Sequence, residues 1–472
     1  MNMISIKSAQ IHGLEQKEIR IEGIKTRGLK QLHLTGLADT GLRDSREKIA
    51  QVIQDFVPWS PVERLLIHLM PPEVNKSGAH LEVPIAVACM VLCHPDLLSE
   101  ATQQVLREHV FVGALSLDGS LVPTPISSMV EAANENAIGP QRMRHLEDLW
   151  LWLLNPETLP TRSDAASPPP ETLTPTPLVK ERQWERLLLL AASLAEVPVL
   201  LMGPPGVGKS HLARWAASTK VPAPPGTELE ELQQIWSLAG MSLPSRNPLV
   251  TPQPRAHLSE FTGTASLGAT RPGYFSLSHR GTLLVDEFTE LSKDCREILR
   301  FILDEKTFMR FSRAGNVVWP ANFWFIATSN PCPCGYSIGE DFSKCRCSET
   351  VRLAYRNRLS GPIWDRLGLK LFVDKRSGAT LPLSAQVAQR LDAPAPLLHQ
   401  HLLECREPYA ERLTRDRESL ATHSIFAETS PRNRELKTRV WCALQVLEPS
   451  HGAEEWLGML ALMQSSEDGW RR

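Results

Sequence analysis

The sequence VLLMGPPGVGKSHLARWAA, residues 199–217, is the strongest indication of the fold of this chain. Four apolar residues form a candidate buried strand, a glycine-rich loop follows at once, and HLARWAA begins a helix. In this strand–loop–helix context the pattern GxxxxGK[ST] predicts a phosphate-binding loop, because backbone N–H groups and the helix N-terminus then face phosphate oxygens. The predicted loop consists of Gly203, Pro204, Pro205, Gly206, Val207, Gly208, Lys209 and Ser210.

Two side chains of the loop would contact bound ATP and Mg²⁺ directly. Lys209 is expected to reach the β- and γ-phosphates, and the Ser210 hydroxyl is expected to bind Mg²⁺. Average composition alone would give this pattern in roughly 2% of chains of this length. The loop therefore needs support from a second motif.

That second motif is TLLVDE, residues 282–287, an apolar strand that ends in two carboxylates. We expect Asp286 to hold Mg²⁺ through water and Glu287 to polarise the attacking water as a general base. An isolated Asp-Glu pair would more often be a solvated strand end. Following a phosphate-binding loop, the pair instead predicts an ATPase core with a parallel α/β sheet.

A third apolar strand, FWFIAT at residues 323–328, leads to Asn330. At the tip of that strand, Asn330 would lie between the other two strand ends and hydrogen-bond the γ-phosphate or the attacking water. The alternative is an asparagine that opens a turn before Pro331.

Four cysteines cluster just after this strand, as Cys332-Pro-Cys334 and Cys345-Arg-Cys347. Four thiols in so short a span favour a tetrahedral structural zinc site that closes the loop. Two disulfides or four unliganded thiols are the alternatives. The other five cysteines are interpreted as buried structural thiols.

Length and composition indicate a globular protein of more than one domain. The chain has 472 residues, a formal net charge of -2 and 42% hydrophobic residues, with no apolar run long enough to span a bilayer. Because the N-terminus does not resemble a secretory signal, we expect a cytoplasmic location without membrane contact. The predicted domains are residues 1–153, a proline-rich linker at 154–179, the ATPase core at 180–378 and a helical lid at 379–472.

Longer stretches resemble the magnesium-chelatase-like ComM (YifB) family of bacterial AAA+ ATPases. They include RPGYFSLSHRGTLLVDEF, FSRAGNVVWPANFWFIATSNPCPCGY and YRNRLSGPIWDRLGL in the core, and HLTGLADTGLRDSREKI and HLMPPEVNKSGAHLEVPIAVA before it. The resemblance implies a homo-oligomeric ring, expected to be a hexamer, with ATP at subunit interfaces. It also implies that Arg366 is an arginine finger and that Arg432 occupies the lid's sensor-2 position, where it would bind nucleotide.

The same resemblance implies a DNA helicase that promotes branch migration during natural transformation. The segment FMRFSRAGNVV, residues 308–318, would form a hairpin that projects into the ring's pore. Arg310, Phe311 and Arg313 suit phosphate contact and base stacking on single-stranded or branched DNA. A structural hairpin with solvated arginines is the alternative.

The N-terminal block resembles the Lon-protease-like fold, an α/β domain of the ribosomal S5-like kind. The resemblance places His80 where the protease has its nucleophilic serine, and Ser128 where it has its lysine. Ser77 and Lys76 lie nearby, but adjacent side chains are poorly placed to face each other. We therefore expect an accessory or oligomerisation domain without peptidase activity.

Three functions remain open at this point. A DNA translocase would hydrolyse ATP faster with DNA and lose activity with salt. A chelatase-like or MoxR-like motor would remodel a protein partner and ignore DNA. A non-catalytic nucleotide-binding scaffold is disfavoured, because Lys209, Asp286, Glu287 and Arg366 are all present.

Overall fold

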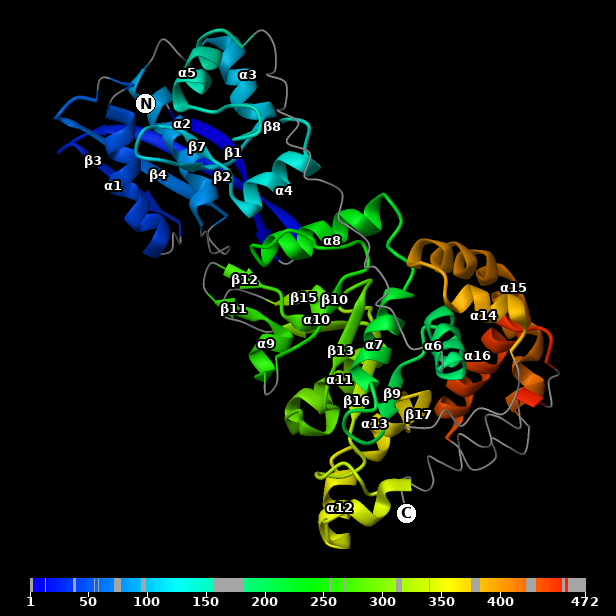
Figure 1. The fold of residues 1–472 in the computed structure, drawn as a ribbon. Helices are drawn as coiled ribbons and strands as arrows, with labels where there is room; N and C mark the ends of the chain where they lie inside the picture. The colour runs from blue at the N-terminus through cyan, green and yellow to red at the C-terminus, as the bar shows by residue number, and fades with distance from the viewer. Residues whose placement is uncertain are drawn as a thin grey trace.

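The computed structural model is an elongated molecule in which the central sheet lies between an N-terminal α/β block and a C-terminal helical block (Figure 1). It describes residues 3–12, 14–36, 40–54, 56–57, 59–71, 78–94, 99–156, 182–253, 256–266, 269–310, 316–338, 340–374, 383–421, 430–451 and 455–456. Most of the predicted linker lies outside these residues, as do Lys76, Ser77, Phe311 and Arg313.

The N-terminal block is built on a six-stranded sheet in the order β3-β4-β2-β1-β5-β8. The pairs β1–β2 and β2–β4 are antiparallel, whereas β3–β4, β1–β5 and β5–β8 are parallel. Alternating burial along β4 directs one of its faces into the core, as expected for a strand of period two. The strands of this sheet are β1 (Met3–His12), β2 (Glu15–Arg27), β3 (Gln31–Thr35), β4 (Glu63–Met70), β5 (Val110–Phe111) and β8 (Ala137–Ile138).

Helix α2 forms the centre of this block's core. Every residue of its sequence EVPIAVACMVLC is buried, because the helix packs against β1, β2 and α1 at once. A short hairpin, β6 (Ala114–Leu115) and β7 (Leu121–Val122), lies beside it. The helices of this block are α1 (Thr40–Gln54), α2 (Glu82–Cys93), α3 (Glu100–Glu108), α4 (Pro125–Ala133) and α5 (Leu146–Leu154).

The central sheet has five parallel strands in the order β10-β13-β16-β9-β17. All side chains of β9, β13 and β16 are buried, which is typical of parallel strands covered by helices on both faces. Since β16 lies between β13 and β9, the three predicted strand ends are neighbours. The strands are β9 (Val199–Met202), β10 (Leu249–Val250), β13 (Thr282–Val285), β16 (Trp324–Ser329) and β17 (Leu369–Phe372).

Helices surround the central sheet, and two hairpins extend from it. The hairpin strands are β11 (Thr264–Ser266) with β12 (Ala269–Arg271), and β14 (Thr307–Arg310) with β15 (Val317–Pro320). The helices are α6 (Gln183–Leu194), α7 (Lys209–Ser218), α8 (Thr227–Leu238), α9 (Leu258–Thr262), α10 (Tyr274–Leu277), α11 (Lys293–Glu305), α12 (Glu349–Arg356) and α13 (Gly361–Arg366).

The C-terminal block is helical, as predicted from its apolar periodicity. It consists of α14 (Ala385–Leu391), α15 (Ala395–Ala421) and α16 (Pro431–Leu447). α16 begins where Ser430 accepts a hydrogen bond from Asn433 N and Pro431 occupies the first turn, a favoured helix start. It packs against α15 and α6, so the lid and the central sheet share one apolar core.

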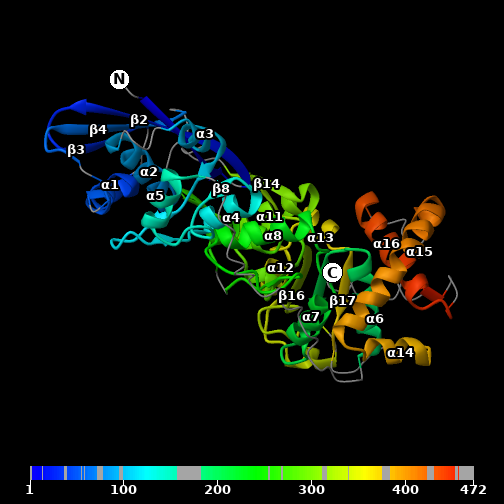
Figure 2. The same ribbon diagram turned by 90° about the horizontal axis from the view of Figure 1, so that it is seen from above.

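The N-terminal block contacts the central block through α4 and α8, which are neighbours in both views (Figure 2). Leu238 of α8 packs against an apolar cluster that includes Met129 and Val130 of α4. Among the helices of the described residues, none is long and apolar enough to cross a membrane.

Candidate nucleotide-binding and catalytic site

The glycine-rich loop leaves β9 at Met202 and enters α7 at Lys209. Gly206 and Gly208 have φ of 77° and 88°, in the left-handed region that glycine adopts without a Cβ penalty. A Cβ at either position would meet no atom within 4 Å, so both glycines border open space. The loop at the α7 N-terminus is therefore open to an anion, as a phosphate-binding loop would need to be.

Lys209 folds back across this loop. Its Nζ donates to the carbonyl oxygens of Gly203 at 2.9 Å and Pro204 at 2.8 Å, and to Oδ1 of Asn330 at 3.1 Å. Burial lowers the pKa of Lys209, while the charges of Asp286 and Glu287 act to raise it. The Lys209 ammonium is thus held at the strand ends, next to the predicted sensor asparagine.

Asp286 and Glu287 follow β13 directly and are exposed to solvent. Asp286 Oδ1 accepts hydrogen bonds from Ser210 Oγ and Thr328 Oγ1, each at 2.9 Å. The two predicted Mg²⁺ ligands therefore already touch each other. Hydroxyl and carboxylate oxygens are the ligand types that Mg²⁺ prefers, so the donor set fits this ion.

The backbone at Glu287 is left-handed, with φ of 52°, which is uncommon for a residue other than glycine. Its N–H donates to Thr328 Oγ1 at 3.2 Å, and its carbonyl accepts from Glu290 N at 2.7 Å. Thr328 therefore binds both predicted catalytic carboxylate residues. No motif singled out Thr328, although it is the only threonine of the third apolar strand and lies near the end of that strand.

Arg366 and Arg432 lie together, and both bind the carboxylate of Asp304. Arg366 Nε lies 3.1 Å from each Asp304 oxygen, and Arg432 Nη2 pairs with Asp304 Oδ1. The helix containing Arg366 leads to Gly368, whose N–H donates to Pro198 O just before β9. The glycine-rich loop instead follows β9, a strand roughly 13 Å long at 3.3 Å per residue.

Both arginines therefore lie near the amino ends of the central strands, whereas the phosphate loop of the same chain lies at the carboxyl ends. The structure does not bring Arg432 to that loop, where a nucleotide-binding residue would be needed. Asp304, which pairs with both arginines, could not be recognised from the sequence. It is one acidic residue among several on an amphipathic helix.

The four clustered cysteines converge, as their spacing suggested. Their Sγ atoms all lie within 4.8 Å of one another, and three of the Sγ–Sγ distances are 3.3, 3.6 and 3.9 Å. Tetrahedral zinc with bonds of about 2.3 Å places sulfurs about 3.8 Å apart. All four cysteines are free, and these separations far exceed the roughly 2.05 Å of a disulfide. The thiol set therefore fits zinc.

The cysteine loop lies directly on the phosphate loop. Gly335 has φ of 88°, and a Cβ there would approach Pro205 Cδ to 2.5 Å. Burial opposes ionisation of Cys334, but N–H groups of Tyr336 and Arg346 bond its sulfur and lower its pKa to about 6. Sequence patterns did not reveal the contact between Gly335 and Pro205.

The predicted DNA-contacting residues are only partly described. Arg310 is the last residue of β14, and its Nη1 donates to Thr262 Oγ1 at the base of the β11–β12 hairpin. That bond joins β14 to the end of α9, two residues before β11. No sequence pattern had predicted the β11–β12 hairpin.

In the N-terminal block, His80 is a packing residue. It is 1% exposed, and desolvation lowers its pKa to about 4 against a backbone hydrogen bond with Ala9 that raises it. Nearby, the buried Glu82 accepts from Lys48 Nζ at 2.7 Å and from Ser45 Oγ at 2.5 Å. The Lys48 ammonium is therefore held in an ion pair.

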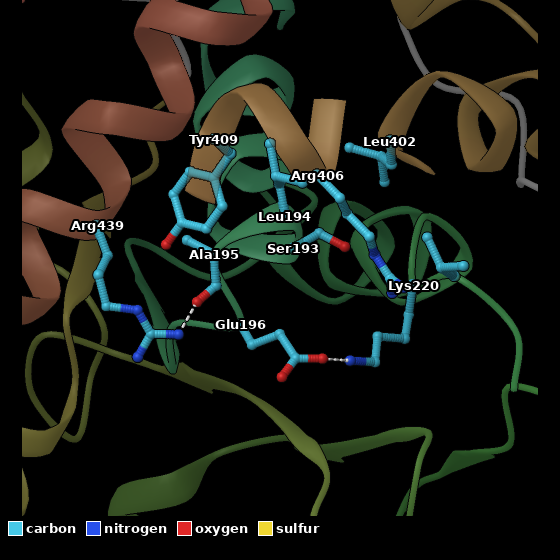
Figure 3. A pocket seen from close by; sticks show the side chains of 10 residues that line it. Ser193, Leu194, Ala195, Glu196, Lys220, Leu402, Arg406, Tyr409 and Arg439 are labelled. Carbon is cyan, nitrogen blue, oxygen red and sulfur yellow. Dashed lines mark hydrogen bonds and ion pairs between the residues drawn. The ribbon is translucent and has the colours of Figure 1, made fainter. Parts of the chain in front are cut away.

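A pocket of about 310 Å³ opens between α6, α15 and α16 (Figure 3). Arg439 donates to Ala195 O, and Lys220 pairs with Glu196. α6 and α7 both end here, so these cations lie at the negative ends of two helices. Protein partners and helix ends therefore account for the Arg439 and Lys220 cations in this pocket without a bound ligand.

Two family profiles match the chain. "Magnesium chelatase, subunit ChlI" matches residues 178–381, and "Subunit ChlI of Mg-chelatase" matches residues 21–140. The second match covers much of the N-terminal block, and the first covers the central block.

Similar curated proteins come from several bacteria. YifB of Salmonella typhimurium is 30% identical over 396 residues, covering 79% of this chain and 76% of its own length. An uncharacterised protein of Mycobacterium tuberculosis is 29% identical over 398 residues, covering 79% and 77%. Competence protein ComM of Haemophilus influenzae is 24% identical over 429 residues, covering 83% and 82%. The chain therefore belongs to the magnesium chelatase-like family of AAA+ ATPases that includes YifB and ComM.

Proposed function

We propose that this protein is an ATP-hydrolysing motor whose catalytic site is shared between neighbouring copies of the chain. One observation carries the proposal: Lys209, Ser210, Asp286, Glu287 and Asn330 all meet at the carboxyl edge of the central sheet. In a parallel α/β sheet, this edge is where ligands bind.

Each residue has a distinct role in the proposed reaction. The loop N–H groups and Lys209 bind the phosphates, and Lys209 exchanges its carbonyl partners for phosphate oxygens. Ser210 and Asp286 hold Mg²⁺, which neutralises charge on the β- and γ-phosphates when bound. Glu287 accepts a proton from the attacking water, and Asn330 orients that water or the γ-phosphate.

Arg366 and Arg432 complete the site of an adjacent copy. Their position at the amino ends of the central strands, away from their own phosphate loop, supports a role at the nucleotide of a neighbour. A guanidinium there would stabilise the charge that develops on the transferred phosphoryl group. This arrangement favours a closed ring, for which a hexamer is our proposal.

DNA is the proposed substrate of the motor. The resemblance to a competence protein supports it, as does the β14–β15 hairpin predicted to project into the ring's pore. A protein partner is the second candidate. It is favoured by exposed apolar side chains around α12: Phe342, Val351 and Leu353 are 45–51% exposed.

The deciding experiment measures steady-state ATP hydrolysis with and without single-stranded and forked DNA. Glu287→Gln should slow hydrolysis at least about 100-fold while leaving ATP binding intact. Glu305→Gln, which alters an exposed carboxylate at the far end of α11, is the matched control. Equal ATP turnover with every DNA would refute the DNA motor and favour protein remodelling. No hydrolysis at all would refute the ATPase.

The four cysteines are proposed to bind one structural zinc ion per chain. All four ligand positions would be filled by thiolates, so the ion would have no open position for catalysis. Its role would be to fix the loop whose Gly335 rests on Pro205.

A further inference from the structure

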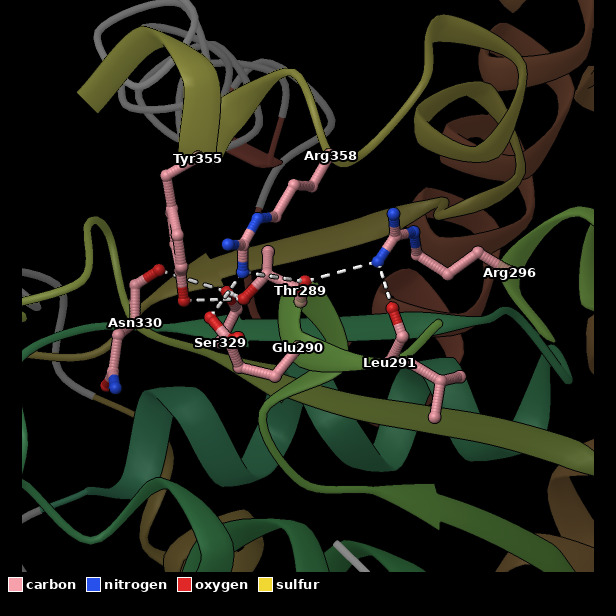
Figure 4. A network of polar contacts seen from close by, with 8 residues as sticks. All are labelled: Thr289, Glu290, Leu291, Arg296, Ser329, Asn330, Tyr355 and Arg358. Carbon is pink, nitrogen blue, oxygen red and sulfur yellow. Dashed lines mark hydrogen bonds and ion pairs between the residues drawn. The ribbon is translucent and has the colours of Figure 1, made fainter. Parts of the chain in front are cut away.

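A buried chain of hydroxyl groups connects helix α12 to the turn that carries Glu287 (Figure 4). Thr289 Oγ1 lies 2.5 Å from the Tyr355 hydroxyl and 3.2 Å from Ser329 Oγ, with a hydrogen bond at each contact. Ser329 Oγ then donates to Asn330 O at 3.0 Å. Thr289 Oγ1 is the donor to Tyr355, whose hydroxyl oxygen accepts.

The same turn is held from its other side by two arginines. Arg296 Nη1 donates to Thr289 O at 3.2 Å, and Arg358 Nη1 donates to Glu290 Oε1 at 2.7 Å. Neither arginine touches the Thr289 side chain in these contacts. The hydroxyl of Thr289 therefore depends on Tyr355 and Ser329 for its orientation.

Glu287 needs such support because its backbone is strained. A left-handed residue other than glycine costs about 1–3 kcal/mol and persists only where its surroundings fix it. Thr328 holds the N–H of Glu287 on one side, at 3.2 Å. Thr289 lies two residues further along, in the short turn Phe288–Glu290 that follows Glu287.

Tyr355 is the buried residue of α12, whose other side chains are exposed or half-buried. It is 3% exposed, whereas Val351 and Leu353 on the same helix are 45% and 50% exposed. α12 lies at one end of the central block in Figure 1, and it begins just after the cysteine loop. The helix is therefore attached through the face that reaches the catalytic turn.

We propose that Tyr355 is a positioning residue for Glu287, acting through the Thr289 hydroxyl, so that α12 sets the rate of ATP hydrolysis without contacting ATP. The proposal rests on the ATPase function above. Burial raises the pKa of Tyr355, so its hydroxyl keeps its proton throughout the neutral range.

Removing the Tyr355 hydroxyl should affect the chemical step alone. Tyr355→Phe keeps the buried ring and its contact with the Arg358 guanidinium, 5.3 Å from the ring centroid. The variant frees Thr289 to rotate, and the Glu287 carboxylate then spends less time in the productive geometry. We expect kcat to fall about tenfold, while KM and the Kd for ATP change less than about twofold.

The test is a double-mutant cycle on ATP hydrolysis in the full chain, measured without DNA. The variants are Tyr355→Phe, Thr289→Val and the pair together; Thr289→Ser is the conservative rescue, and Tyr409→Phe in the lid is the matched control. If Tyr355 acts through Thr289, the double variant should be no slower than Thr289→Val alone. Thr289→Ser and Tyr409→Phe should keep the kcat of the unmodified protein.

The outcomes separate this inference from the proposed function. The positioning role would be overturned if the losses of kcat in the two single variants multiplied in the double variant. It would also be overturned if Tyr355→Phe kept its kcat, or if it lost ATP affinity to the same extent as kcat. Melting temperatures identify a variant that fails to fold, and Ser329→Ala then tests the same chain from its other end, with the same expected loss of kcat. Hydrolysis missing from the unmodified protein would overturn the ATPase itself.

Discussion

Replacing Gly335 with alanine should weaken ATP binding through a contact that no sequence motif reveals. The new Cβ would lie 2.5 Å from Pro205 Cδ, whereas ordinary contacts begin at 3.4 Å. The phosphate loop or the cysteine loop must therefore move by about 0.9 Å (3.4 − 2.5). Pro205 is part of a rigid ring in the backbone of the phosphate loop, so the displacement reaches the neighbouring N–H groups.

The expected loss of ATP affinity can be estimated from the hydrogen bonds that those N–H groups would donate to phosphate. A hydrogen bond to a charged group contributes about 1.5–3 kcal/mol, so losing one should cost about 2 kcal/mol. That corresponds to a Kd for ATP about thirty times higher. The backbone strain of alanine at φ of 88° adds a stability cost of about 1–2 kcal/mol that is separate from binding.

Gly240→Ala is the matched control for this strain. Gly240 has φ of 76°, and a Cβ there would meet no atom within 4 Å. Titration with a fluorescent ATP analogue gives the Kd of both variants, and thermal unfolding gives their stability. Equal ATP affinity in Gly335→Ala and Gly240→Ala would refute the reasoning, because strain alone would then account for both.

Three further predictions concern other parts of the molecule. Arg366→Ala and Lys209→Ala should each hydrolyse ATP about 1,000-fold more slowly. Mixing the two variants should restore part of the activity, because one copy then supplies the arginine and the other supplies the phosphate loop. A mixture as inactive as its components would contradict a shared site. Elemental analysis should find one zinc ion per chain, which Cys345→Ser should lose and Cys93→Ala should keep. An unmodified protein without zinc would contradict the metal site. His80 has a pKa of about 6.5 in the unfolded chain but about 4 in the folded chain, so between these values only the unfolded chain binds the proton. The free energy of unfolding should therefore fall by about 2 kcal/mol from pH 7 to pH 5. Urea unfolding of the unmodified protein and of His80→Gln measures that fall, and an equal fall in both would contradict it.

Much of the ATPase core could be predicted because its motifs are local. A glycine loop, a strand that ends in Asp286 and Glu287, and a strand that ends at Asn330 each combine a short pattern with a buried strand. The carboxyl ends of parallel strands meet at one sheet edge, so separate motifs could be assigned to one site. The cysteine cluster was equally accessible, because its four thiols lie close together in sequence.

The sequence alone predicted the P-loop fold, the residues proposed to bind phosphate and Mg²⁺, and a zinc-type spacing of four thiols. The pairing of Asp304 with both Arg366 and Arg432, at the amino ends of the central strands, is seen only in the folded chain. The tertiary structure also placed Gly335 on Pro205 and joined Tyr355 to Thr289. These contacts join residues that lie 62 to 130 positions apart in the chain, and no local periodicity or spacing encodes them. They depend on how loops and helices pack once the sheet has formed.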